Sequence, residues 1–414
     1  MNTEEFQQKS WSPLQKITFR LLFTYIILYV LTLLLSPLLE STLRWFGTNI
    51  LGYTNEIKLE STGSGDRSFD YVRLVFSLLL TFIITGLWSL LDTKRKNYQQ
   101  HFNLLTRIIR VILLLAMLLY GFGKLFKGQF ADHSFEKLVQ TVGELSPMGL
   151  AWTFMGHSFA YNIFIALSEI IGGVLLLSKR TKTLGSIIIL GVMTNVFMMN
   201  MTYDIPVKLV SFHIILLALV LLYTDKDRLL HFFFKNKNVP QSNYEPAFKN
   251  PKTQTAVSSI KKLVLVLILA TVSIQLLVQF KIRDQLKEKS ALYGLWKADS
   301  FQKNSQILQP LTNDTYRWEY FIFEEKNKAV IKRMTGEIDR FEVTVDTVKH
   351  QLTFSSEKNS DKLMISYKKL NANHLEFKGV FYGDTLTISF KKMTREDFTL
   401  TNRKFHWINE QSFQ

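Results

Sequence analysis

The stretch LVFSLLLTFIITGLWSLL, residues 74–91, contains no charged side chain and is long enough to cross a bilayer as one helix. A transmembrane helix needs about 20 mostly apolar residues. Six further stretches of this kind lie along the chain, so the sequence predicts a polytopic membrane protein in contact with membrane lipids. The predicted spans are Leu21–Leu39, Leu74–Leu91, Ile108–Phe126, Ala151–Ser178, Leu184–Met201, Pro206–Tyr223 and Leu263–Phe280.

The formal net charge of +16 is concentrated in short loops between these spans. Basic clusters follow the second, fourth and sixth spans, for example Lys94-Arg95-Lys96 and Lys179-Arg180, whereas the intervening loops are neutral or acidic. Positively charged loops stay on the cytoplasmic side. The pattern therefore predicts a bacterial inner (cytoplasmic) membrane protein with a cytoplasmic N-terminus. With seven crossings, the C-terminal domain lies outside the cytoplasm. Because this loop pattern explains the positive charge, we expect no nucleic acid partner.

The hydropathy pattern divides the chain into four parts. Residues 1–235 form the predicted transmembrane helical bundle of spans one to six, and 236–258 form a polar, Pro/Asn-rich cytoplasmic linker. Residues 259–290 carry the seventh span and a charged stem. Residues 291–414 contain no apolar stretch of helix length and form an extracytoplasmic β domain.

Alternating apolar residues, such as Phe341, Val343 and Val345, mark half-buried strands in this last domain. The predicted fold is thus a membrane all-α bundle followed by a small antiparallel β domain, most simply an up-and-down barrel. Gly294-Leu295-Trp296 is similar to the opening of lipocalin-like barrels. The predicted strands are Leu292–Phe301, Tyr316–Phe323, Ala329–Met334, Arg340–Asp346, Gln351–Ser355, Lys362–Lys368, His374–Phe377, Thr385–Lys391 and a closing Lys404–Ile408.

Ionisable and polar side chains inside apolar spans are functional candidates, because burying them in a bilayer is costly. The predicted topology brings polar groups from four spans to the outer half of the bundle. If span four is one helix, His157 and Tyr161 share one face, and Asn162 and Glu169 share another. The catalytic candidates are Glu169, Lys124 and His213; the ligand-binding candidates are His157, Tyr161, Asn162, Asn200, Asp204 and Lys208.

Structural explanations of the same residues stay open. Lys124, Asp204 and Lys208 lie near the ends of spans, where a long side chain reaches the interface. Glu169 is as well explained by pairing with an amide or a group on a neighbouring span as by proton transfer. His157 and His213 lie on two spans, as axial haem ligands do, but isolated histidines are common and we do not expect haem.

Several enzyme classes are excluded. The chain has no cysteine, which excludes disulfides, thiolate metal sites and cysteine catalysis. It also lacks a phosphate-binding loop, a zinc-protease helix motif, a nucleophile elbow and a dinucleotide fingerprint.

Three motifs resemble bacterial DoxX-like membrane proteins: Tyr120-Gly121-Phe122-Gly123-Lys124, then Glu169-x-x-Gly172-Gly173, then Tyr203-Asp204-Ile205-Pro206-Val207-Lys208. The resemblance covers about residues 105–225 and implies a four-helix core in spans three to six. It also implies a link to quinone or oxidant chemistry in the cell envelope, with Glu169 and Lys124 as the first residues to test.

Two functional hypotheses compete. In the first, the protein is a quinone-linked redox component, in which Lys124 and Lys208 polarise the quinone and Glu169 or His213 moves protons. In the second, it is a non-enzymatic lipid- or ligand-binding protein, whose barrel holds an apolar molecule. A scaffold role as a subunit of a larger membrane complex is a further alternative, and the sequence does not decide whether the protein is an enzyme.

Overall fold

The computed structural model describes residues 10–54, 63–240, 291–356, 359–403 and 405–412, with single positions between 255 and 278. The predicted span Leu263–Phe280 and most of the predicted linker lie outside these ranges. The chain forms two compact units. One contains residues 1–129 and 160–270, and the other contains residues 130–159 and 271–414.

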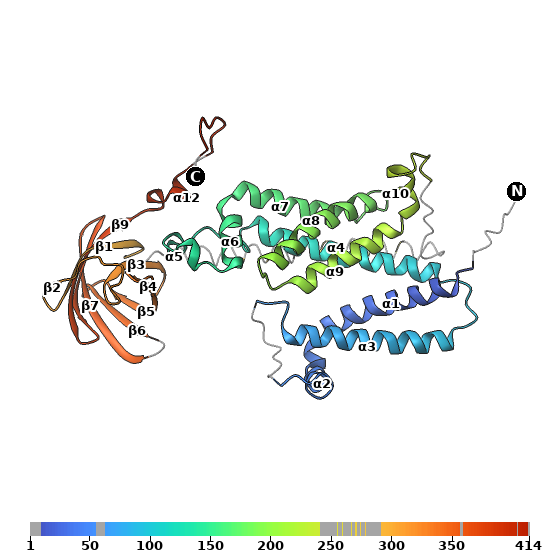
Figure 1. The fold of residues 1–414 in the computed structure, drawn as a ribbon, viewed down its shortest axis with the longest axis horizontal. Helices are drawn as coiled ribbons and strands as arrows, with labels where there is room; N and C mark the ends of the chain where they lie inside the picture. The colour runs from blue at the N-terminus through green and yellow to red at the C-terminus, as the bar shows by residue number, and fades with distance from the viewer. Residues whose placement is uncertain are drawn as a thin grey trace. The chain divides into compact units, whose positions relative to one another are not determined.

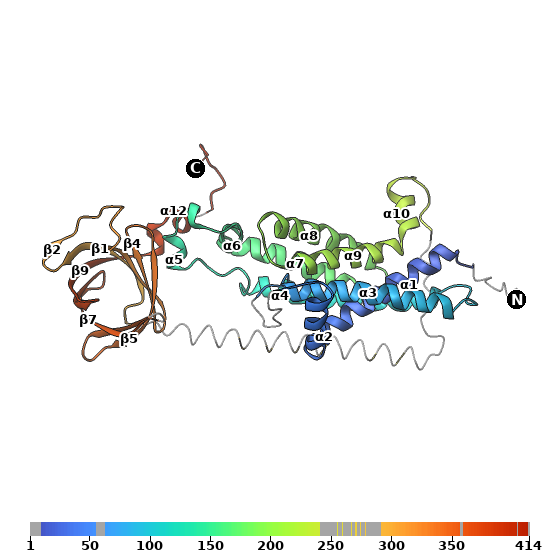
Figure 2. The ribbon, with the colours of Figure 1, turned by 60° about the horizontal axis from the view of Figure 1, so that its bottom comes forward.

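The first unit is a bundle of apolar helices (Figures 1 and 2). Four of the described helices, α1, α3, α4 and α8, are long and apolar enough to cross a membrane, and up to six spans result if each of two bent helix pairs is one span. The protein is a membrane protein. The helices are α1 Pro13–Leu34, α2 Ser36–Asn49, α3 Ser68–Leu91, α4 Gln99–Leu125, α7 Phe159–Leu175, α8 Lys182–Thr202, α9 Lys208–Tyr223 and α10 Lys226–Phe233.

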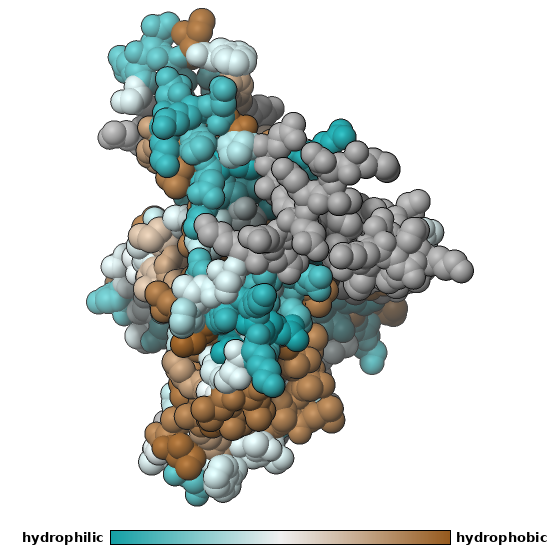
Figure 3. Space-filling model, turned by 90° about the vertical axis from the view of Figure 1, so that its right-hand side faces the viewer, coloured by the Kyte–Doolittle hydropathy of each residue, from teal (hydrophilic) through white to brown (hydrophobic). Residues whose placement is uncertain are grey.

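Apolar side chains are exposed along the outer faces of these helices, as a lipid environment requires. Phe82 on α3 and Leu119 on α4 are 65% and 62% exposed. Figure 3 shows extensive brown, hydrophobic surface on one face of the molecule, beside a hydrophilic, teal area.

Two predicted spans differ from the observed helices. The prediction Leu21–Leu39 is wrong at its end, because α1 stops at Leu34 and a separate helix, α2, begins at Ser36. Pro37 lies in the first turn of α2, where its missing N–H costs nothing, whereas inside a continuous helix it would clash with the preceding turn.

The stretch Ala151–Ser178 is not one continuous helix, although its two helices together can form one bent span. Helix α6, Pro147–His157, ends before Ser158, whose backbone is extended, and α7 begins at Phe159. Gly156 explains the close packing at this end, since a Cβ atom there would lie 2.5 Å from the Ala131 carbonyl oxygen. His157 and Tyr161 therefore do not share a helix face.

The second unit contains an eight-stranded antiparallel β-barrel, which confirms the predicted fold class (Figure 1). Strand β1 and strands β3 to β9 form the barrel and pair in this order, and β1 closes it by pairing with β9, for example Trp296 with Lys392. The strands are β1 Gly294–Lys303, β2 Gln306–Ile307, β3 Trp318–Glu325, β4 Lys328–Arg333, β5 Ile338–Asp346, β6 Gln351–Ser356, β7 Asn359–Asn371, β8 His374–Phe381 and β9 Asp384–Met393.

The predicted closing strand Lys404–Ile408 is wrong. A short helix, α12 Thr399–Asn402, follows β9, and the described residues 405–408 form no strand. The barrel needs no ninth strand to close, because β1 already occupies the edge of β9. The short β2, which pairs only with the end of β1, was not predicted.

Aromatic side chains fill the barrel interior. Phe321, Phe377 and Phe390 are fully buried, and the ring of Phe377 lies 5.0 Å from each of the other two, measured between centroids. Trp296 is also buried, and its indole N–H donates to the Leu292 carbonyl at 2.9 Å. These residues pack against one another as a hydrophobic core.

The segment that follows α4 packs on the outside of the barrel. Its α5, Phe135–Leu138, and a short 3-10 turn contact the barrel, and α6 follows them in the chain. Phe135 is buried against Leu295 and Ile322. The Phe135 N–H donates to the Glu324 carboxylate at 2.8 Å, and burial raises the pKa of Glu324, although this hydrogen bond and Arg395 favour its charged form.

Candidate functional site

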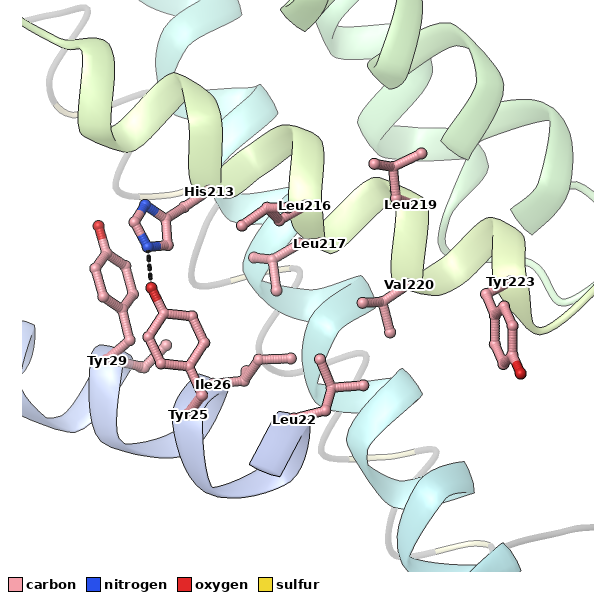
Figure 4. Close-up of a pocket in the computed structure, with 11 residues that line it drawn as sticks. Leu22, Tyr25, Ile26, Tyr29, His213, Leu216, Leu217, Leu219, Val220 and Tyr223 are labelled. Atoms are coloured by element: carbon pink, nitrogen blue, oxygen red, sulfur yellow. Dashed lines mark hydrogen bonds between the residues drawn. The ribbon is translucent and has the colours of Figure 1, made fainter. Parts of the chain in front are cut away.

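A mostly apolar groove of about 320 Å³ lies between α1 and α9 (Figure 4). Leu22 and Ile26 contribute the α1 wall, and Leu216 and Val220 contribute the α9 wall. These positions face one another because apolar residues three and four apart lie on the same side of a helix. At one end the lining changes to a group of polar rings.

That polar end consists of His213 from α9 and Tyr25 and Tyr29 from α1. The Tyr25 hydroxyl lies 2.6 Å from His213 Nε2, and His213 Nδ1 lies 2.6 Å from the Leu209 carbonyl oxygen. A carbonyl can only accept, so Nδ1 carries the proton, and Nε2 of the neutral ring accepts from Tyr25. The Tyr29 ring stacks on His213 at 3.8 Å between centroids, which fixes the imidazole plane.

The Tyr29 hydroxyl makes no hydrogen bond to any part of the chain that the structure describes. Behind Tyr29 lies Arg73 of α3, which is buried and whose guanidinium carbon is 5.7 Å from the tyrosine ring centroid. Arg73 forms an ion pair with Asp70 at 3.5 Å. Its Nε atom has no hydrogen-bond partner among the described residues. The end of the groove thus offers an unused phenolic donor beside a buried cation.

The predicted candidates Lys124 and Glu169 form a buried ion pair between α4 and α7. Lys124 Nζ lies 2.9 Å from both carboxylate oxygens, and both side chains are almost completely buried. Gly121 permits the close helix approach, since a Cβ atom there would lie 3.0 Å from the Ala166 carbonyl oxygen. Among the described residues, no hydrogen bond connects this pair to His213.

Asn200, Asp204 and Lys208 organise the turn between α8 and α9. The Asn200 amide donates to Ser211 Oγ at 3.0 Å, which ties the end of α8 to the first turn of α9. Lys208 forms an ion pair with the exposed Asp204 at 2.9 Å. These contacts give the three residues a structural role at the turn.

The remaining candidates are Asn162, Tyr161 and His157. Asn162 is fully buried on α7, on the same face as Glu169, whereas Tyr161 is 39% exposed. His157 belongs to the other compact unit, where its ring stacks on His133 at 6.2 Å between centroids. Of the nine predicted residues, His157 belongs to one compact unit and the other eight belong to the other.

Sequence reasoning missed the residues that give the groove its polar end. Tyr25 and Tyr29 lie within the predicted span Leu21–Leu39, which is otherwise mostly apolar. Their spacing of four residues places both on one face of a helix, and this is the sequence signal that could have identified them. Arg73 lies one residue before the predicted start of its span, so it was counted with the loop. The observed α3 begins at Ser68 and carries Arg73 into the bundle.

Asp66 was also missed, because Gly63-Ser64-Gly65-Asp66 reads as a simple turn. Its carboxylate accepts hydrogen bonds from the backbone N–H groups of Lys208 and Leu209, at 2.7 and 2.9 Å. It therefore caps the N-terminus of α9 from a distant part of the chain. Nothing in the local sequence reports such a contact.

Comparison with known proteins gives one relative. The chain is 33% identical over 124 residues to YwoB, an uncharacterised protein of Bacillus subtilis (strain 168). The match covers 79% of YwoB but 30% of this chain, so most of this chain extends beyond it. No family model matches the sequence. No solved structure matches the fold. By the extent of this match, the chain belongs to the same family as YwoB.

Proposed function

We propose that this membrane protein is a quinone-linked redox component of the bacterial cell envelope, related to DoxX-like proteins. The observation that carries the proposal is the groove between α1 and α9, apolar along its length and closed at one end by His213, Tyr25 and Tyr29. A membrane quinone has the matching chemistry, namely a ring with two carbonyl acceptors and an apolar tail. Small-molecule sites commonly combine an apolar lining with a few placed polar groups.

Each polar ring has a separate task in this proposal. The Tyr29 hydroxyl donates to a ring carbonyl oxygen. The Tyr25–His213 pair holds a proton next to the ring. When a partner redox protein supplies electrons to the quinone, the ring oxygen that gains negative charge takes up this proton. The Leu209 carbonyl and the stacked Tyr29 ring keep the imidazole in the orientation that this transfer needs.

The proposal places the barrel outside the cytoplasm. Two observations support this side: the basic loops predicted to be cytoplasmic, and the packing of the Phe135 segment on the barrel. In this proposal the segment that follows α4 lies on the same side of the membrane as the barrel.

Replacing Tyr29 by Phe tests the proposal. The variant removes a hydroxyl that has no partner in the described part of the chain, so stability should not change. Binding of a naphthoquinone with a decyl tail should weaken by about two- to tenfold, the value of one hydrogen bond at about 0.5–1.5 kcal/mol. Quenching of intrinsic fluorescence in detergent measures the affinity.

Tyr223→Phe is the matched control, because Tyr223 lines the groove far from His213 (Figure 4). It should leave the affinity unchanged. Equal loss in both variants, or no binding by the wild-type protein, would contradict the proposed head-group position.

A further inference from the structure

We infer that the groove continues as a lane for a single long apolar chain, and that its ligand is a long-chain membrane quinone with the tail held along α1. This inference rests on the proposed function and specifies its substrate class. A second cavity of about 520 Å³ adjoins the groove. Leu22, Val220 and Tyr223 line both cavities, so the two meet at these residues.

The lane is longer than a small soluble ligand. Leu14 lines the second cavity, and Tyr29 lines the polar end of the first. Both belong to α1, and a helix that rises 1.5 Å per residue separates them by about 22 Å. This distance is most of the roughly 30 Å thickness of the hydrocarbon core. A ligand whose ring contacts His213 can therefore extend its tail through most of the membrane without leaving the protein.

The lining is mostly apolar where the two cavities meet. Leu22 and Val220 lie there together with Tyr223, and Phe19 and Phe102 continue the apolar wall beyond them. Thr18, Gln15 and Gln99 add polar groups to the lining of the second cavity. Lipid tails are as apolar as the apolar side chains of the lining, so the lane should add little to the affinity of the protein for a quinone. The experiment therefore has to locate the bound tail rather than measure affinity.

Photolabelling maps the position of the tail. Naphthoquinones that carry a diazirine at the end of a short or a long prenyl tail are bound to the full-length protein in vesicles, irradiated and located by peptide mass spectrometry. The short probe should label the α9 wall near Leu216. The long probe should label the far cavity near Thr18 and Phe102 at least about fivefold more strongly than the lipid-exposed Leu119.

Leu22→Trp narrows the lane where the two cavities meet, and Leu115→Trp on the exposed face of α4 is the matched control. The first variant should abolish long-probe labelling of the far cavity and leave short-probe labelling unchanged. The control should change neither.

The outcomes separate the two proposals. Long-probe labelling spread evenly over lipid-exposed residues would overturn the lane, while short-probe labelling near Leu216 would still support quinone binding. Equal labelling of the far cavity by a phosphatidylcholine diazirine would also overturn it, since the lane would then hold any lipid. Labelling by either probe that a tail-less naphthoquinone does not displace would contradict the proposed function itself.

Discussion

At the scale of single residues, the Lys124–Glu169 pair is the most consequential contact, because both charges are buried in the bundle. Removing one partner leaves an uncompensated charge, which costs about 3–5 kcal/mol, whereas replacing both by apolar residues is often neutral. We therefore predict that Lys124→Met and Glu169→Met each destabilise the protein strongly, and that the double variant recovers most of the loss. Thermal unfolding in detergent measures this.

Arg44→Met, which breaks the partly exposed Arg44–Glu40 pair, is the control and should cost under about 1 kcal/mol. A double variant as unstable as the single ones would show that the pair is not the relevant interaction. Because the proposal assigns the proton to the Tyr25–His213 pair, the same double variant should still bind quinone.

At the scale of elements, α9 depends on a cap that another segment supplies. The Asp66 carboxylate accepts from Lys208 N and Leu209 N, two of the N–H groups that a helix start leaves unpaired. Asp66→Ala should lower stability by about 1–2 kcal/mol. Asp66→Asn should recover only part of this loss, because the two N–H groups use both carboxylate oxygens and an amide has one acceptor oxygen. Asp204→Ala removes an exposed carboxylate nearby and should cost about 0–1 kcal/mol. Equal effects of Asp66→Ala and Asp204→Ala in thermal unfolding would refute the cap.

The helices and strands also show which parts of the fold can be predicted from the sequence. The end of α3 at Leu91 and the start of β6 at Gln351 were predicted correctly, because hydropathy and strand alternation are local signals. The break at Ser158 was not, since it accompanies the packing of Gly156 on Ala131, about 25 residues earlier in the chain. The site shows the same limit. Lys124, Glu169 and His213 were recognised as costly polar residues, but the partners Tyr25, Tyr29 and Asp66 come from distant helices and loops.

At the scale of the whole molecule, the proposed topology places the barrel and the segment after α4 on the outer side. The chain has no cysteine, so single cysteines report their side of the membrane without background. Val142→Cys and Val348→Cys, at exposed positions of the segment and the barrel, should both react with an impermeant maleimide in spheroplasts. Lys94→Cys, between α3 and α4, should react only after permeabilisation. Opposite reactivity of Val142→Cys and Val348→Cys would contradict the packing of the segment on the barrel.

The central claim is that the groove between α1 and α9 holds a membrane quinone. Its most direct test is mass spectrometry of the organic extract of the protein purified in mild detergent, with Leu22→Trp purified in parallel. We predict about one long-chain quinone per wild-type chain and a clear reduction in the variant. A lipid at this stoichiometry without quinone would contradict the claim and favour the lipid-binding alternative. Equal traces of quinone in both preparations would contradict it as well.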